Sequence, residues 1–299
     1  MAANKPLTLV PCSYCASTDA AVLYEAGVAQ VNQIVKCNHC GLMYASPRKP
    51  PDHVEIAEWR DQPELEYENK HPQRFEKERL QIRDYQSTLS LIGRLHPKRG
   101  KLLEVGSSLG FLLDFFRKDG WRVTGVEPDK GAMRHATKKL HIETINAILE
   151  DAAIPDESVD VVVMLHVIEH VPDPVGTFRE IFRVLKSGGH AIVETPRYDS
   201  LMFKLFGRRE RSLSCDGHIF FFTTDSLRKV YAKAGFAHEQ TDYVGRSLTL
   251  DRLVYNLAVI SKSATIQRVA KAVSRRLNFQ KVAFTINVRD MQRICVRKP

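Results

Sequence analysis

Between Lys101 and Pro196, short apolar runs alternate with amphipathic segments, and this alternation limits the fold more than any other feature of the chain. The runs KLLEV, WRVTGVE, IETINA, SVDVVVML and HAIVETP are predicted as strands, and the segments between them as helices. The valine run from Val161 to Val163 has no polar alternation, which is typical of a strand buried on both faces. The sequence therefore predicts an α/β fold with a mainly parallel sheet and helices on both faces.

Further elements are expected outside this core. A polar helix is predicted over about 64–95, and a helix over DPVGTFREIFRVLKSGG should end at its Gly-Gly pair. A helix over TTDSLRKVYAKAGF should have Thr224 or Asp225 as its N-cap and end at Gly235. The segment from Ile286 to Val296 is expected to form the final, antiparallel strand of the sheet.

Four of the six cysteines form two Cys-x-x-Cys pairs, Cys12/Cys15 and Cys37/Cys40, with 21 residues between the pairs. The start of the chain has no long apolar core typical of a secretion signal, so we expect a cytoplasmic protein with reduced thiols. Two such pairs supply the tetrahedral thiolate shell that Zn²⁺ prefers. A four-thiolate shell has no open position, which predicts a structural zinc ribbon over 1–46. His39 is expected at the surface.

A turn of small residues follows the first predicted strand, with Glu104, Gly106, Ser108 and Gly110 in the order EVGSSLG. Such a turn, at the start of a helix, brings backbone amides close to a ligand. Glu127 comes 21 residues after Gly106, at the end of the next strand, where an acid can accept hydrogen bonds from a ribose. The spacing departs from that of NAD sites, and an acid before the turn suits a cationic ligand better than a pyrophosphate.

Four blocks in this order, LLEVGSSLG, GVEP, AAIPDESVDVVVMLHVIEHVPDP and VLKSGGHAIVETP, resemble the class I methyltransferases that use S-adenosylmethionine (SAM). The resemblance implies a Rossmann-like sheet of seven strands. It also implies that Glu104, Gly106 and Gly110 frame the methionine end of SAM and that Glu127 holds the ribose. Ser108 stands where many members have glycine, and it is small enough to keep the turn. The remaining contacts implied are Leu149 and Glu150 at the adenine, and the backbone of His166 beside the methionine.

The whole chain is similar to a narrower group, bacterial methyltransferases with an N-terminal four-cysteine motif that act on sugars, polysaccharides or secondary metabolites. The residues that carry this likeness are CGLMYASPR, EHVPDP, GHIFFFTTDSLRKVYAKAGF and TINVRDMQRICVRKP. The likeness implies an acceptor among small molecules.

Two histidines are the candidates for activating that acceptor, because histidine transfers protons near neutral pH. His170 follows the fourth strand at the carboxyl end of the sheet, where ligands bind in open α/β folds. His218 lies in a segment, 197–222, that interrupts the strand and helix alternation and is predicted to be an insertion capping the pocket. Glu169 is interpreted as structural, and Arg197 and Tyr198 either line the substrate pocket or face solvent. The alternative for both histidines is a structural role in loops.

The net charge of +9 comes from residues 251–299, since the charges of residues 1–250 sum to zero. A basic helical segment is predicted over 252–281. It is either solvated on one side, covering an anionic substrate, lying on an anionic membrane surface, or in contact with a nucleic acid. We expect three parts, 1–46, a helical linker over 47–100, and the methyltransferase domain over 101–299. A nucleic-acid partner is disfavoured, because the first 100 residues carry no basic patch with aromatics. The alternatives to a small-molecule enzyme are an RNA or protein methyltransferase and an inactive SAM-binding protein.

Overall fold

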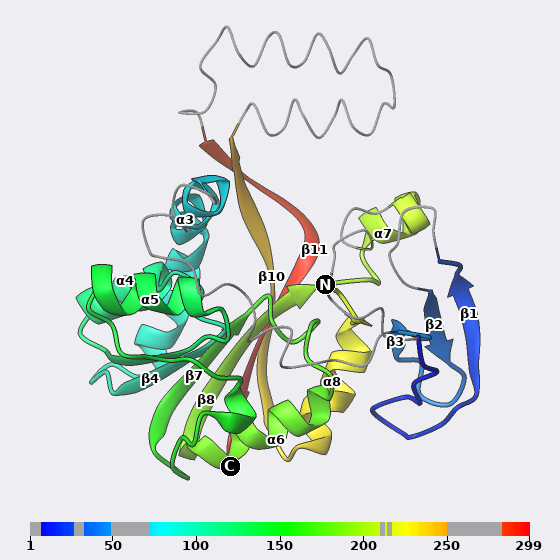
Figure 1. Ribbon diagram of the computed structural model, residues 1–299, viewed down its shortest axis with the longest axis horizontal. Coiled ribbons are helices and arrows are strands. Elements are labelled where there is room, and N and C mark those ends of the chain that lie inside the picture. The colour runs from blue at the N-terminus through cyan, green and yellow to red at the C-terminus, as the bar shows by residue number, and fades with distance from the viewer. Residues whose placement is uncertain (1–6, 27–32, 49–71, 210–212, 214–216, 250–282) are drawn as a thin grey trace, which may run out of the picture.

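The computed structural model describes residues 7–26, 33–48, 72–209, 213, 217–249 and 283–299. Its larger sheet has seven strands in the order β10-β11-β8-β7-β4-β5-β6 (Figure 1). The neighbouring pairs among β4, β5, β6, β7 and β8 are all parallel. Strand β11 is antiparallel to both of its neighbours, β10 and β8. The prediction of a seven-stranded α/β sheet closed by an antiparallel strand is confirmed. The bounds are β4 Lys101–Val105, β5 Arg122–Val126, β6 Thr144–Ile145, β7 Val159–Leu165, β8 Leu185–Pro196, β10 Ala237–Thr249 and β11 Ala283–Arg297.

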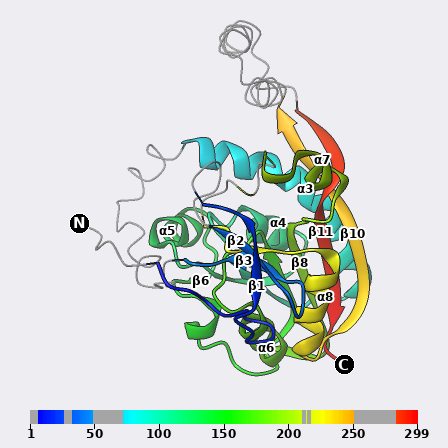
Figure 2. The same cartoon turned by 90° about the vertical axis from the view of Figure 1, so that its right-hand side faces the viewer.

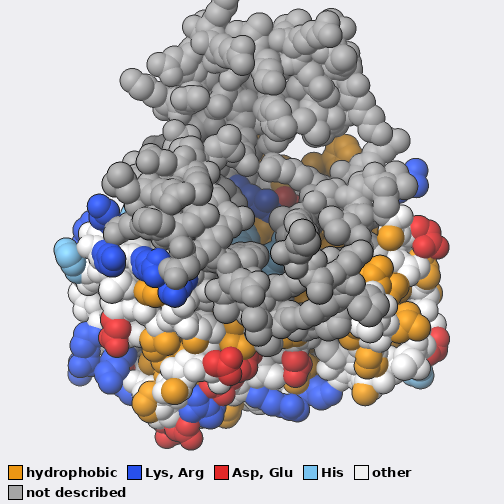
Figure 3. Space-filling view, in the orientation of Figure 1, with side chains coloured by type: hydrophobic (Ala, Val, Ile, Leu, Met, Phe, Trp, Pro, Cys, Tyr) orange, Lys and Arg blue, Asp and Glu red, His pale blue; other side chains and the backbone are white. Residues whose placement is uncertain are grey.

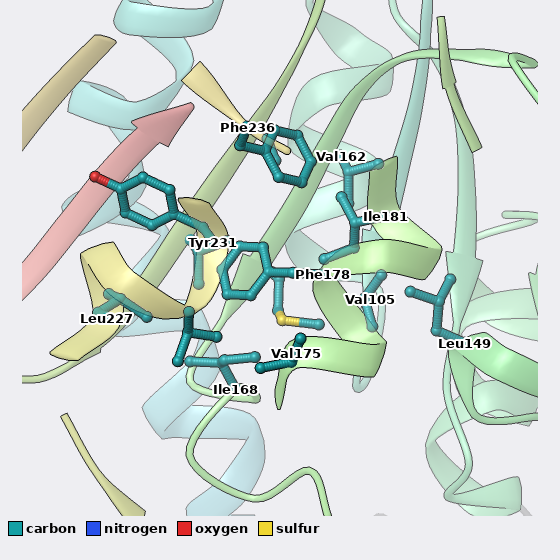
Figure 4. Close-up of a cluster of buried hydrophobic side chains, with 14 of the residues drawn as sticks. Val105, Leu149, Val162, Ile168, Val175, Phe178, Ile181, Leu227, Tyr231 and Phe236 are labelled. Carbon is teal, nitrogen blue, oxygen red and sulfur yellow. The ribbon is translucent and has the colours of Figure 1, made fainter. Parts of the chain in front are cut away.

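Side chains of β7 alternate between two buried clusters, one on each face of the sheet. Val161 and Val163 pack with residues of α3 (Pro72–Leu95) and α4 (Phe111–Lys118). Val162 and Met164 pack with residues of α6 (Pro174–Val184) and α8 (Thr224–Lys233). Figure 4 shows Phe178 and Ile181 of α6 beside Tyr231 and Phe236. The valine run is therefore buried on both faces, as its composition predicts. The remaining helices are α5 Lys130–Lys139, α7 Leu201–Phe206, η1 Leu149–Asp151 and η2 Gly207–Arg209.

The N-terminal residues form a second, smaller antiparallel sheet in the order β1-β2-β3-β9 (Figure 2). Its strands are β1 Ala20–Tyr24, β2 Ile34–Cys37, β3 Met43–Ala45 and β9 Phe220–Phe221. Tyr44 pairs with Phe220, so the last strand comes from the predicted insertion over 197–222. Cys12, Leu42 and Tyr44 belong to the same buried cluster as Phe222 and Leu227. The N-terminal module and the larger domain therefore share a sheet and a core.

Two helix ends differ from the predictions. Helix α6 ends at Val184, and the backbone is extended from Leu185, whose N–H still donates to the Ile181 carbonyl. Leu185 pairs with Val159, and Gly188 and Gly189 lie in an irregular start of β8. The glycine pair therefore does not end the helix, because the buried Leu185 already belongs to the sheet.

The N-cap of helix α8 lies one residue before the first of the two predicted caps. Thr223 is the N-cap, and its hydroxyl accepts the Ser226 N–H in a reciprocal capping box. The prediction of Thr224 or Asp225 was wrong, because Ser226 can complete that box only with Thr223. The described part of the helix predicted over 64–95 is α3, and the basic segment over 252–281 lies outside the described residues. Within the described ranges, no helix combines the length and apolar composition that a membrane span requires.

A buried polar network ties α3 to the sheet. The Thr88 hydroxyl donates to Glu194 Oε1 at 3.2 Å, and Arg293 Nη1 donates to the Thr88 hydroxyl at 2.8 Å. Arg293 also pairs with Asp242 at 3.1 Å, so its charge is shared between two acids. Burial raises the pKa of Glu194 to about 7, against the lowering effect of Arg293.

This shift predicts a pH dependence of folding stability. A carboxyl group with a raised pKa in the folded state stabilises that state most below its ordinary pKa of 4.5, and this contribution is lost as pH rises to about 7. In urea unfolding experiments from pH 4.5 to 7.5, the unfolding free energy of wild type should therefore fall relative to that of Glu194→Gln. A constant difference across this range would contradict the raised pKa.

Candidate functional site

The turn after β4 has the backbone that the glycine pattern predicts. Gly106 and Gly110 have φ values of +73° and +80°. Ser108 has φ +47°, so serine holds the left-handed conformation where many members of the class have glycine. Gly110 is the N-cap of α4, which places the free amides of that helix at the carboxyl end of β4. The turn can therefore present backbone N–H groups to a ligand.

Glu127 follows β5 and reaches across this turn. Its Oε2 accepts the Ser108 N–H at 2.7 Å, and its Oε1 accepts the Asp129 N–H at 2.8 Å. The residue is buried, with 6% of its surface exposed. The two hydrogen bonds orient the carboxylate beside the glycine turn, where the class resemblance puts the ribose of SAM.

The other predicted SAM contacts lie around the same edge of the sheet. Glu104 is buried within β4, beside Gly125 of β5 and Val163 of β7. In η1, the Leu149 side chain is buried in the core. Glu150 accepts a hydrogen bond from the Thr177 hydroxyl at 2.7 Å and lines a surface hollow of about 540 Å³.

His166 comes directly after β7 and has φ +59°. Its N–H donates to the Glu194 carbonyl, and its ring Nδ1 lies 3.9 Å from Glu169 Oε1. The turn that it begins brings together the two histidines that the sequence singles out. The rings of His170 and His218 meet edge to face at 71°, with centroids 4.7 Å apart, although 47 residues separate their hydrogen-bonded loops.

Glu169 lies at the centre of this group. Its side chain is fully buried, its Oε2 accepts the Thr195 hydroxyl at 2.9 Å, and its Oε1 lies 4.0 Å from His218 Nε2. Burial raises the pKa of Glu169, and the charge of His170 acts against that shift. The backbone carbonyl of Glu169 accepts the N–H groups of Ile219 and Phe220, which fixes the segment carrying His218.

Sequence reasoning treated Glu169 as structural and did not single out Thr195. The signal that could have found Glu169 is an acid after two apolar residues at the carboxyl end of a buried strand. Tyr198 was one of two candidates for the substrate pocket, and its hydroxyl lies 3.4 Å from His218 Nδ1. Arg197, the other, stacks over the ring of Tyr243 at 4.3 Å. Figure 3 shows basic, acidic and histidine side chains near the middle of this view.

His170, His218 and Glu169 are called the histidine group below. The glycine turn and the histidine group adjoin each other. Val105 pairs with Met164 in parallel strands, so the loops after β4 and β7 start side by side. A Cβ placed on Gly106 would lie 2.3 Å from Cγ2 of Val167, which directly follows His166. This contact leaves no room for a side chain at Gly106.

Replacement of Gly106 by alanine should therefore destabilise the fold and weaken SAM binding. The left-handed φ costs about 1 kcal/mol, and the clash with Val167 adds about 1–3 kcal/mol. Gly188→Ala is the matched control, because Gly188 has φ +76° and open space around its Cβ position. Chemical unfolding should show the larger loss for Gly106→Ala, and Val167→Ala in the same chain should recover part of it. Equal losses in the two glycine variants would rule out the clash.

The four paired cysteines converge as the sequence predicts. Every Sγ atom lies within 4.8 Å of the others. Cys12 and Cys40 Sγ are 3.4 Å apart, and Cys15 and Cys37 Sγ are 3.5 Å apart. A tetrahedral shell with Zn–S bonds of about 2.3 Å has edges of about 3.8 Å, close to these distances. The four thiols therefore fit a single zinc ion.

Backbone amides surround two of these sulfurs. Burial raises the pKa of Cys37, but the N–H groups of Cys40 and His39 outweigh it and lower the pKa to about 7. Burial raises the pKa of Cys12, against N–H groups of Cys15 and Tyr14. Gly41, with φ +80°, closes the second turn. His39 is exposed and lies near Asp19, as expected of a surface residue. Cys215 lies outside the described residues.

Curated relatives match parts of this chain. A probable S-adenosylmethionine-dependent methyltransferase of Mycolicibacterium smegmatis is 35% identical over 96 residues, covering 32% of this chain and 37% of its own length. A ubiquinone biosynthesis O-methyltransferase of Vibrio vulnificus is 36% identical over 103 residues, covering 32% and 43%. An uncharacterized methyltransferase of Mycobacterium leprae is 34% identical, covering 44% and 50%. The chain thus spans half or less of these relatives.

Solved structures share the fold at low identity. A chain of the complex between the Haloferax volcanii Trm112 methyltransferase activator and the putative methyltransferase is 18% identical, with a TM-score of 0.52 over 75% of this chain and 93% of its own. A SAM-dependent methyltransferase of Archaeoglobus fulgidus is 15% identical, with a TM-score of 0.50 over 71% and 92%. The family model described as a methyltransferase domain matches residues 73–241, more than half of the sequence. The chain therefore belongs to the methyltransferase-domain family, with the fold of SAM-dependent methyltransferases.

Proposed function

We propose that this protein transfers a methyl group from SAM to a small-molecule acceptor. The observation that carries the proposal is the glycine turn with the Glu127 carboxylate hydrogen-bonded across it at 2.7 Å. Gly106 and Gly110 let the ligand approach the backbone, and Glu127 would accept hydrogen bonds from the ribose hydroxyls. Bound SAM supplies an activated methyl group, and this chain's residues hold the sulfonium and acceptor in line.

We further propose that His170 and His218 activate the acceptor. They stand beside the loop that touches Gly106, at the carboxyl edge of the sheet where ligands bind. Thr195 holds the carboxyl group of Glu169 next to His218. Activation makes the acceptor atom a better nucleophile, because the atom loses its proton as the methyl group is transferred.

A sugar, a polysaccharide precursor or a secondary metabolite is the acceptor class that we favour. The N-terminal four-cysteine module supports it, because the resembling group acts on such compounds. The Vibrio vulnificus relative, named for O-methylation in ubiquinone biosynthesis, supports an oxygen atom on a small molecule as the acceptor. The zero net charge of residues 1–250 gives less support to a nucleic acid.

We also propose that the four cysteines bind a structural zinc ion in a reducing, cytoplasmic setting. Their sulfur separations fit the edges of a tetrahedral thiolate shell. All four positions of such a shell are filled by protein, so this ion would hold β1 to β3 together and take no part in methyl transfer.

Label transfer tests the proposed activity. Purified protein is incubated with methyl-labelled SAM and an extract of its source cells, and small polar molecules, lipids, protein and RNA are separated. We expect label among small molecules or lipids with wild type and none above background with Glu127→Ala. Label in RNA or protein would replace the small-molecule proposal, and the absence of label from every fraction would favour an inactive SAM-binding protein.

A further inference from the structure

One oxygen of the buried Glu169 carboxyl group is not satisfied by hydrogen bonds within the described residues. Its Oε1 atom is buried and has no hydrogen-bond partner among those residues. The nearest ring nitrogens, His166 Nδ1 and His218 Nε2, lie 3.9 and 4.0 Å away, beyond hydrogen-bond distance. A buried carboxylate oxygen without a partner is costly. The gap between this oxygen and the imidazoles is therefore a place for a further group.

Three side chains bring one potential ligand atom each close together. Glu169, His170 and His218 supply a carboxylate oxygen and two ring nitrogens that all lie within 4.8 Å of one another. Metal bonds to such atoms measure about 2.0–2.2 Å, so two ligands of one ion lie about 3.0–4.2 Å apart, depending on the angle. The 4.0 Å between Glu169 Oε1 and His218 Nε2 falls in this range.

The second polar atom of each side chain is already held. Thr195 donates to Glu169 Oε2, the Gly217 carbonyl accepts from His170 Nδ1 at 2.9 Å, and the Tyr198 hydroxyl lies 3.4 Å from His218 Nδ1. The Gly217 bond puts the proton of neutral His170 on Nδ1 and leaves a lone pair on Nε2. Protein metal ligands are oriented in this way, by hydrogen bonds to the atom that does not bind the ion.

We propose that Glu169, His170 and His218 bind a divalent cation. Two imidazoles and one carboxylate suit first-row transition ions that accept nitrogen and oxygen, and three protein ligands leave open positions for an acceptor. The inference rests on the proposed function, because it specifies how the two histidines act. An acceptor hydroxyl on the ion would release its proton to solvent, the C–S bond of SAM would break as the C–O bond forms, and S-adenosylhomocysteine would leave as a neutral thioether.

The test is Mn²⁺ binding by the full-length, zinc-loaded protein, followed through the electron paramagnetic resonance signal of free Mn²⁺. Manganese prefers nitrogen and oxygen to thiolates, so the cysteine cluster does not compete for it. We expect a single Mn²⁺ site in wild type and a loss of affinity of ~100-fold in Glu169→Gln and in His170→Ala. His170 is exposed, so its replacement leaves the fold intact.

Two further variants separate ligation from general structure. Thr195→Val keeps the shape of a buried side chain but removes its hydrogen bond to Glu169, and it should weaken Mn²⁺ binding by ~10-fold. His141→Asn removes an exposed histidine elsewhere and should bind Mn²⁺ as wild type does. The unfolding midpoints of His141→Asn and His170→Ala are expected to stay near that of wild type. Thr195→Val leaves a buried carboxylate oxygen without its donor and should lower the midpoint, so its Mn²⁺ binding is measured well below that midpoint.

The outcomes distinguish this inference from the proposed function. Wild-type protein that leaves all Mn²⁺ free, or variants that bind it as tightly as wild type, would overturn the cation site. If label transfer from SAM still proceeds in that case, the proposed function stands without it. Mn²⁺ binding that Glu169→Gln abolishes, together with no label transfer, would keep the cation site and count against methyl transfer.

Discussion

Glu127→Ala is expected to weaken SAM binding by at least ~100-fold, since hydrogen bonds to a charged group contribute about 1.5–3 kcal/mol each and two ribose hydroxyls would lose theirs. Isothermal titration of SAM into the purified protein measures the effect. The expected loss is large because the carboxylate is fixed in place before the ligand arrives, by the amides of Ser108 and Asp129.

The same two hydrogen bonds complicate the alanine variant, because their loss also loosens the turn. Glu127→Gln keeps the size of the side chain and one of the two acceptor oxygens, so it removes the charge while losing only one of the two hydrogen bonds to the turn. Glu143→Ala serves as the control, since Glu143 is an exposed acid at the same edge of the sheet. Unchanged SAM affinity in Glu127→Ala would rule out the ribose placement, whatever the stability of the variant.

Cys37→Ser is expected to remove the zinc ion and to lower methyl transfer by ~10-fold or more, although Cys37 does not belong to the histidine group. Binding of a structural zinc ion is coupled to folding of its module, so loss of one ligand should unfold β1 to β3. Strand β9 would then lose its partner β3, and His218 lies two residues before that strand.

Zinc content by atomic absorption, thermal unfolding and label transfer together measure this prediction. Cys295→Ala is the matched control, because Cys295 is a buried cysteine in β11 and belongs to the other core cluster. It should keep its zinc and show a loss of stability only. A Cys37→Ser protein that keeps both zinc and full activity would contradict the predicted coupling between the N-terminal module and the histidine group.

The sequence predicted the parts of the molecule that depend on local patterns. The valine run of β7, the glycine turn at Gly106 and the two cysteine pairs each have a spacing that follows from one element or one turn. The structure confirms the sheet, and it brings the cysteines together. The end of α6 was misplaced because Leu185 pairs with Val159, and no local signal in the helix shows that partner.

Only part of the histidine group could be predicted from the sequence. His170 follows a strand and could be singled out from its position, whereas the importance of Glu169 depends on Thr195 and on a segment about 50 residues away. A buried acid in an apolar run favours a structural interpretation unless its partners are known. The pairing of β3 with β9 was also missed, since Phe220 and Phe221 form a two-residue strand inside an apparent insertion.

The sheet shared by β3 and β9 has a consequence for the order of folding during synthesis. All four clustered cysteines leave the ribosome before Phe220, which follows Ala45 by more than half of the chain. At about 5–20 residues per second, the edge of β3 waits roughly ten to thirty-five seconds for its last partner. Zinc loading in that interval would hold the nascent module closed and keep its thiols from oxidation until the strand next to His218 arrives.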